Sequence, residues 1–305
     1  MKINNFATKY FPVKRHPYII YSFALLSMLF WGLSFVWFKI VITIYEPITI
    51  IFLRLVISSI FLFCLLAILH QFQKIKPSDY KSFLFLALFQ PFFYFLGESY
   101  GLKFVSSTIS SVIISTIPLF SPLVAYLTIK EKISRSSLIG IIISFIGLLF
   151  MLINKDLSLN ASPKGIMLLF FAVFSALGYS VIIKNLAHKY SALTIITYQN
   201  TLGAFYFLPL FLIFDFNHFI NVVPSFYQIS ALLQLAIFAS SGAYFFYIIS
   251  IREIGVVRSN IFTNTIPIFT AIFSYFILAE KFGVNKIAGM VIVISGLVVS
   301  QIKRY

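Results

Sequence analysis

Two charged residues lie inside long apolar stretches of this sequence: Arg54 in "PITIIFLRLVISS" and Glu98 in "PFFYFLGESYGL". A charge in such surroundings is costly, and it usually faces the interior of a helix bundle or a water-filled cavity. Together the two residues could form a site for a zwitterionic or ionic solute, or Glu98 could release a proton in one state. The alternative is structural: a buried ion pair, or snorkelling side chains, that only fix helix packing.

The sequence lacks the residue clusters that most enzymes need. Its histidines, His16, His70, His188 and His218, are widely separated, and its single cysteine, Cys64, lies in an apolar run. No pair of them has the spacing of metal ligands, and no nucleotide-binding or hydrolase motif is present. We therefore expect no catalytic residue, no metal and no cofactor.

Several neutral side chains inside the apolar stretches could line a solute path. These aromatic, hydroxyl and amide residues are Trp31, Tyr94, Ser115, Thr116, Gln199, Asn200, Tyr244 and Asn264. Two prolines, Pro118 and Pro267, each follow such residues and should interrupt a helix, because proline leaves a carbonyl without its helical partner. We expect these prolines to be hinges beside a cavity. The alternatives are packing kinks, hydrogen bonds that only join helices, and aromatic rings that face lipid.

The elements that position these residues must be membrane helices. Hydrophobic residues make up 60% of the chain and charged residues 10%, whereas a soluble domain is about half apolar and a quarter charged. The mean hydropathy is +1.00. Apolar windows of about 20 residues, which cross the hydrocarbon layer, predict an all-α integral membrane protein with ten transmembrane helices. The predicted spans are 17–38, 46–69, 82–102, 105–128, 134–153, 164–184, 193–214, 226–250, 255–279 and 284–302.

The basic residues predict the orientation of these helices. The net charge of +15 would suggest a nucleic-acid partner in a soluble protein, but a membrane protein concentrates Lys and Arg in its cytoplasmic loops. Most of them fall on one side if the N-terminus lies inside, so we expect cytoplasmic N- and C-termini in the inner (plasma) membrane and no nucleic acid. The predicted parts are a cytoplasmic segment 1–16, a first five-helix repeat 17–153, an external linker 154–163, a second five-helix repeat 164–302 and a cytoplasmic tail 303–305.

The two halves of the chain repeat one another. Thr116-Ile117-Pro118 recurs as Thr265-Ile266-Pro267, and Glu131-Lys132 recurs as Glu280-Lys281. Two glycines of the first half also align with glycines of the second, Gly140 with Gly289 and Gly147 with Gly296. A weaker match in the earlier helices aligns Lys39 with Lys184 and Arg54 with Gln199. Because five helices are an odd number, the second repeat starts on the opposite side of the membrane. Inverted repeats of this kind are typical of secondary transporters.

Several stretches of the sequence resemble those of a known family. The stretches "FWGLSFVWFKIV…EPITIIFLRL" and "ESYGLKFVSSTISSVIISTIPLFSPLVAYLTIKEKISRSSLIG", with the second-half copy of the latter, look like EamA-type transporters of the drug/metabolite transporter superfamily. The resemblance covers about residues 18–302. It implies ten helices in two inverted repeats, a cavity between them and export of amino acids or other small metabolites. The second half departs from the pattern, since "SALGYSVIIKNL" lacks a tryptophan-glycine pair and Gln199 replaces the arginine.

The sequence therefore predicts a secondary transporter, an exporter of small organic metabolites that works by alternating access. Its expected partners are a small-molecule metabolite, membrane lipid and protons as the coupling ion. The glycines at 140, 147, 289 and 296 should let helices pack closely, within the chain or in a homodimer. The alternatives are a non-transporting membrane scaffold or sensor, a lipid-modifying membrane enzyme and a passive channel.

Overall fold

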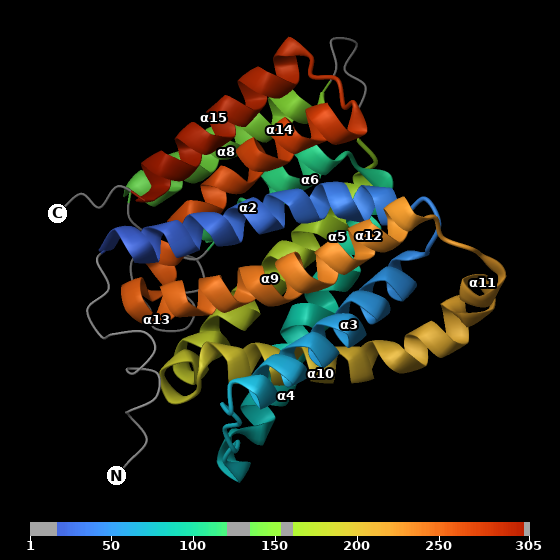
Figure 1. Ribbon diagram of the computed structural model, residues 1–305. Coiled ribbons are helices and arrows are strands. Elements are labelled where there is room, and N and C mark those ends of the chain that lie inside the picture. The colour runs from blue at the N-terminus through green and yellow to red at the C-terminus, as the bar shows by residue number, and fades with distance from the viewer. Residues whose placement is uncertain (1–16, 121–134, 154–160, 302–305) are drawn as a thin grey trace.

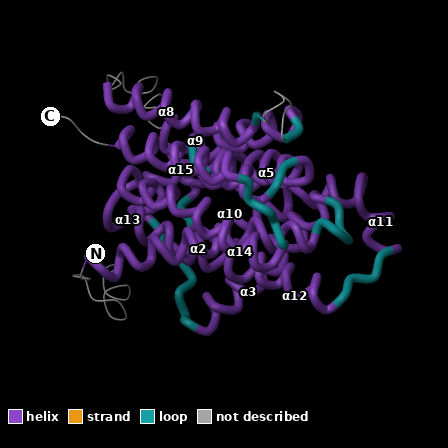
Figure 2. The backbone as a smooth tube through the Cα atoms, turned by 90° about the horizontal axis from the view of Figure 1, so that it is seen from above, coloured by secondary structure: helices purple, strands orange, loops and turns teal. Residues whose placement is uncertain are grey.

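The computed structural model describes residues 17–120, 135–153 and 161–301, and these form a bundle of α-helices (Figure 1). The predicted N-terminal segment, most of the linker, the Glu131-Lys132 pair and the predicted tail 303–305 lie outside the described residues. The start of α2 and the end of α15 lie on the same side of the bundle, at the left of Figures 1 and 2.

The first half begins with two long helices and continues with shorter helical pieces. In chain order the elements are α2 (Pro17–Val41), α3 (Pro47–Ile68), the 3-10 turn η1 (Pro77–Asp79), α4 (Tyr80–Ala87), the π-helical η2 (Leu88–Phe93), α5 (Tyr94–Phe104), α6 (Ser107–Ile114) and α8 (Arg135–Leu152). The pieces from η1 to α5 follow one another without a loop and make one span, which bends at Gln90.

The second half follows the same plan. In chain order its elements are α9 (Pro163–Lys189), α10 (Ala192–Leu210), η3 (Phe211–Asp215), α11 (Phe216–Asn221), α12 (Phe226–Gln234), η4 (Leu235–Ala243), α13 (Tyr244–Ile261), the 3-10 turn η5 (Phe262–Thr265), α14 (Ile266–Leu278) and α15 (Val284–Gln301). Within α13 the chain turns at Gly255, whose φ of 83° favours glycine. Gly255 thus separates two spans.

Prolines and capping serines mark the starts of several helices. Pro47 and Pro163 stand in the first turn of α3 and α9, where proline's missing N–H costs nothing. Ser106 and Ser191 cap α6 and α10 by accepting a hydrogen bond from a backbone N–H of the first turn. Ser225 forms a reciprocal capping box at α12.

Seven helical segments of the described chain are long and apolar enough to cross a membrane. The protein is therefore a multi-pass membrane protein by length and composition. Three more apolar helices are shorter, and they cover Ser107–Phe120, Leu138–Leu152 and Val284–Ser300. The predicted count of ten spans stays a prediction, since seven helices of the described part have the length and composition of a span.

The last helices of the two halves, α8 and α15, lie side by side (Figure 1). A Cβ added to Gly140 would lie 2.5 Å from the carbonyl oxygen of Gly296, and one added to Gly147 would lie 2.7 Å from that of Gly289. The later residue of α8 meets the earlier residue of α15, so the helices are antiparallel. The glycines thus serve a contact inside one chain, and this contact pairs equivalent positions of the two repeats.

The second helices of the two halves are also antiparallel neighbours. Phe52 of α3 stacks on Phe211 at 4.6 Å between ring centroids, while Phe63, nearer the other end of α3, meets Tyr198 of α10 at 6.3 Å. Equivalent helices therefore pair in opposite senses at two places in the bundle.

Candidate functional site

A cavity lined by residues of both halves lies between the helices. Its walls come mainly from α2, α3, α5, α9 and α13. Neither α8 nor α15 contributes a lining residue. The glycine-packed pair therefore stands apart from the site.

Arg54 reaches the cavity from α3 and is 3% exposed. Its Nε donates a hydrogen bond to Ser240 Oγ at 2.8 Å, and its guanidinium carbon lies 4.2 Å from the centre of the Phe95 ring. Its two terminal nitrogens donate to no residue of the described chain. The guanidinium is therefore held through its Nε, and its two terminal nitrogens are in a position to bind a carboxylate.

Asn200 supports this arrangement from α10. Its Nδ2 donates to Ser58 Oγ at 2.7 Å and to the carbonyl oxygen of Ser240 at 2.8 Å. Ser58 is in turn hydrogen-bonded to Ser241. Asn200 thus joins α3, α10 and η4 around Arg54, and it acts as a positioning residue outside the cavity lining.

Glu98 reaches the same cavity from α5 and is 7% exposed. Its Oε1 accepts a hydrogen bond from the hydroxyl of Tyr94, one turn earlier, at 2.7 Å. Among the ion pairs of the described residues, none joins Arg54 to Glu98. The cavity therefore contains a cation and an anion that do not neutralise each other by direct contact.

Aromatic residues form another part of the cavity wall. The Trp31 ring meets Tyr244 and Tyr247 edge-on, at 5.1 and 4.9 Å between centroids. Gln90 Nε2 donates to the Tyr244 hydroxyl, and the Tyr247 hydroxyl donates to Asn260 Oδ1. These bonds fix the tyrosines in the wall.

Most lining residues occupy equivalent positions of the two repeats. Extending the internal alignment to the lining gives the pairs Trp31 and Ala176, Ser34 and Tyr179, Phe35 and Ser180, Phe95 and Tyr244, Glu98 and Tyr247, Ile114 and Thr263, and Ile117 and Ile266. The site is therefore built from the same helix faces twice. The side chains on those faces differ.

Five of the ten residues proposed from the sequence line the cavity: Arg54, Glu98, Trp31, Tyr94 and Tyr244. The other five, Ser115, Thr116, Gln199, Asn200 and Asn264, are buried behind its wall. Ser115 and Thr116 donate their hydroxyls to carbonyls of their own helix.

The two prolines follow breaks in the helices. The helix α6 ends at Ile114, and a turn at 115–116 precedes a short helical stretch that includes Pro118. In the second half, η5 interrupts the span before α14, which has Pro267 in its first turn. Cavity-lining residues flank both breaks: Ile114 and Ile117 in one, Thr263 and Ile266 in the other. The hinge role of the prolines stays a prediction.

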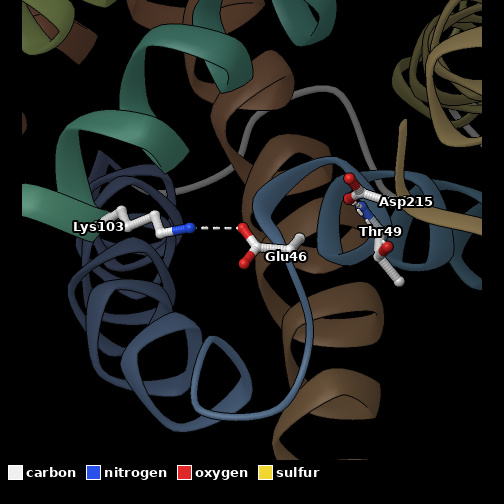
Figure 3. Close-up of polar contacts among 4 residues, drawn as sticks. All are labelled: Glu46, Thr49, Lys103 and Asp215. Atoms are coloured by element: carbon white, nitrogen blue, oxygen red, sulfur yellow. Dashed lines mark hydrogen bonds and ion pairs between the residues drawn. The ribbon is translucent and has the colours of Figure 1, made fainter. Parts of the chain in front are cut away.

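Polar contacts gather at both ends of the span from η1 to α5. At the α5 end, Lys103 Nζ lies 2.5 Å from Glu46 Oε2 (Figure 3). Beside it, Asp215 Oδ2 accepts hydrogen bonds from Thr49 N at 2.9 Å and Thr49 Oγ1 at 3.0 Å. Asp215 thereby caps the start of α3, a task that Ser191 performs locally for α10.

At the other end of that span, Asp79 joins the two halves. Its carboxylate accepts hydrogen bonds from Lys189 Nζ at 2.8 Å and from the Tyr190 hydroxyl at 2.7 Å. Nearby, Ser191 N donates to Gln73 Oε1 at 2.9 Å. This end is held by charged and neutral contacts between the repeats.

Seven polar residues of the cavity wall were not among the proposed site residues: Ser34, Gln90, Tyr179, Ser180, Tyr247, Asn260 and Thr263. The internal repeat carried a signal for two of them, because Tyr247 matches Glu98 and Tyr179 lies one turn after the match of Trp31. Nothing in the sequence singled out Asn260 among the polar residues near the break.

Comparisons with known proteins agree with this architecture. The model of the EamA-like transporter family matches residues 18–153 and 163–301. A Bacillus subtilis protein named uncharacterized transporter YetK is 29% identical over 83% of this chain and 77% of its own length. A protein of Archaeoglobus fulgidus, also named an uncharacterized transporter, is 27% identical over 92% of this chain and 97% of its own. One crystal structure, at 13% identity, shares the fold with a TM-score of 0.67 over 92% of this chain and 98% of the other.

Proposed function

Because the chain belongs to the EamA-like transporter family, we propose that it is a secondary transporter that exports small organic metabolites, such as amino acids, across the plasma membrane. The observation that carries this proposal is the cavity that contains both Arg54 and Glu98. A guanidinium and a carboxylate that do not pair with each other suit a zwitterion, whose carboxylate and ammonium groups can each meet an opposite charge. We assign the protein no catalytic activity.

Alternating access between two inverted five-helix repeats is the mechanism we propose. The antiparallel packing of α8 on α15 and of α3 on α10 supports the inversion, because equivalent helices run in opposite senses. The seven long and three shorter apolar helices support ten spans. The basic loops support cytoplasmic termini.

The two ends of the bundle suggest how the repeats are held together. On the cytoplasmic side of this topology, Asp79 at the start of one span bonds to Lys189 and Tyr190, which follow the first helix of the other repeat. On the external side of this topology, Gln228 Nε2 donates to Thr43 Oγ1 at 2.9 Å. In an alternating-access cycle these two contacts open in turn.

Glu98 is the proposed carrier of a coupling proton. It is the acidic side chain that lines the cavity, and Tyr94 stabilises its charged form through a hydrogen bond. A carboxylate that gains a proton when the cavity faces one side and loses it on the other would couple solute movement to a pH gradient.

The test compares cells that express the protein with cells that express Arg54→Gln. The substituted side chain is the one that stands at the equivalent position, Gln199, so it is compatible with a membrane helix. An untargeted measurement of metabolites in the medium identifies exported solutes, and counterflow in reconstituted vesicles confirms each one. We expect a zwitterionic metabolite to accumulate with the wild type and to fall at least about tenfold with Arg54→Gln, since a charge-assisted pair is lost.

The matched control is Arg258→Gln, because Arg258 is exposed and lies outside the cavity lining. Its export should equal that of the wild type. Flux that does not saturate would indicate a channel. Absence of flux for every metabolite tested would reject the transporter assignment and favour a scaffold or sensor.

A further inference from the structure

The two halves of the cavity carry different polar groups at equivalent positions. In the first repeat these positions hold the charged Arg54 and Glu98. In the second repeat they hold the neutral Gln199 and Tyr247. The first repeat contributes the charged residues of the cavity wall, and the residues that the second repeat contributes, here called the neutral half, carry no charge. Trp31 and Tyr244, whose rings meet edge-on, line the same cavity.

The neutral half contains buried polar atoms that lack a hydrogen-bond partner in the described chain. Asn260 is 3% exposed, and its Oδ1 accepts the Tyr247 hydroxyl while its Nδ2 has no partner there. Tyr179 is 2% exposed, and its hydroxyl likewise has none. Both residues line the cavity. A buried polar group normally finds a partner, since leaving it unpaired is costly.

Gln199 adds to this neutral region from behind the wall. It is fully buried, and neither atom of its amide group has a hydrogen-bond partner within the described residues. It lies close to Tyr179 without a hydrogen bond of good geometry between them.

We propose that the cavity selects an α-amino acid whose side chain ends in a neutral hydrogen-bonding group. The proposal rests on the function proposed above and names its substrate class. The carboxylate lies at Arg54 and the ammonium at Glu98. The side chain passes Trp31 and Tyr244, and its polar end bonds to Asn260 Nδ2 and the Tyr179 hydroxyl. Tyr179 and Asn260 are thus specificity-determining residues.

This assignment follows from what each half can recognise. A second charged group on the solute would meet no countercharge in the neutral half, because no acidic or basic residue of that half lines the cavity. A wholly apolar side chain would leave the Asn260 and Tyr179 atoms unpaired. A site built to hydrogen-bond a substrate discriminates strongly against an analogue that lacks the bonding group.

The experiment uses purified protein in liposomes and two probes of similar size, L-glutamine and L-methionine. Competition against counterflow of labelled L-glutamine gives the preference between them. The wild type should prefer L-glutamine by at least about tenfold. In Tyr179→Phe, which removes only the hydroxyl, this preference should fall about three- to tenfold while the affinity for L-methionine stays constant.

Asn260→Leu provides a second variant of similar size, and it should reduce the same preference. The matched control is Tyr198→Phe, since Tyr198 lies on α10 outside the cavity lining and should leave the preference unchanged. Thermal unfolding of each variant in detergent verifies that it is folded.

Three results would overturn the proposal. Equal affinity of the wild type for both probes would do so while leaving zwitterion transport intact. A Tyr179→Phe protein that keeps the full preference for L-glutamine would remove Tyr179 from the site. Arg54-dependent flux of another solute, with neither amino acid transported, would reject the substrate class but retain the transporter. If the protein moves no solute at all, the proposed function fails as well.

Discussion

Replacing Asp79 with asparagine should weaken the cytoplasmic closure of the proposed cycle. Asp79→Asn keeps one acceptor oxygen for the Tyr190 hydroxyl but removes the charge that strengthens that bond and holds Lys189. The Lys189 side chain is 55% exposed, so solvent screens its ion pair and little is lost there. The weakened buried bond to Tyr190 dominates. We expect the ratio of closed to open states at this end to fall about three- to tenfold.

The assay measures how fast a reporter cysteine in the cavity reacts from the cytoplasmic side. Ser34→Cys places the thiol in the lining, and Cys64→Ser removes the exposed native cysteine. Inside-out vesicles present the cytoplasmic face to a membrane-impermeant thiol reagent. If the reagent reacts only with the open state, the rate is proportional to the population of that state. Asp79→Asn should therefore raise the rate about three- to tenfold and lower the rate from the external side.

The Gln228–Thr43 contact at the other end gives the matched control. Thr43→Val removes the acceptor of Gln228, a single neutral and exposed hydrogen bond. It should raise the external rate by about twofold at most and leave the cytoplasmic rate near that of the wild type. An unchanged cytoplasmic rate in Asp79→Asn would refute the closure role. Equal increases from both sides would show general loosening of the bundle.

Three other substitutions test separate parts of the structure. Glu98→Gln should abolish flux driven by a pH gradient, and it should retain counterflow only at raised solute concentration, because the ammonium group loses its countercharge; unchanged gradient-driven flux would reject proton coupling through this residue. Gly140→Ala puts a Cβ 2.5 Å from a carbonyl oxygen of α15 and should destabilise the protein by about 1–3 kcal/mol, whereas Gly283→Ala, with no atom within 4 Å, should leave the unfolding temperature unchanged. Asp215→Ala removes the cap of α3 and should cost about 1 kcal/mol in thermal unfolding; a wild-type unfolding temperature would contradict that role.

Hydropathy located the helices better than it located their ends. The predicted span 46–69 agrees closely with α3, Pro47–Ile68. The predicted span 164–184 falls short of α9, which continues to Lys189 through the polar residues near its end. A helix need not stop where the hydrocarbon does, because water satisfies polar side chains beyond it. Apolar windows therefore indicate the part of a helix that lies in the hydrocarbon layer and not the full length of the helix.

The sequence predicted part of the site because a charged side chain inside a membrane helix usually faces the bundle interior or a water-filled cavity. Arg54 and Glu98 could be singled out for that reason, and both line the cavity. Ser115, Thr116 and Asn264 were proposed from their nearness to prolines, and they lie behind the wall. Which face of a broken helix meets the cavity depends on the turn at the break, and local sequence does not determine that turn.

The internal repeat separates residues that build the scaffold from residues that define the site. Where two helices touch, both repeats need the same small side chain, so Gly140 is matched by Gly289 at the α8–α15 contact. A residue that faces the cavity is not restricted to a small side chain in this way, and the position of Arg54 is occupied by Gln199 in the second repeat. Glycines that recur in both repeats therefore indicate packing of the repeats against each other. Buried polar positions that differ between the repeats indicate contact with a solute, which has no internal symmetry of its own.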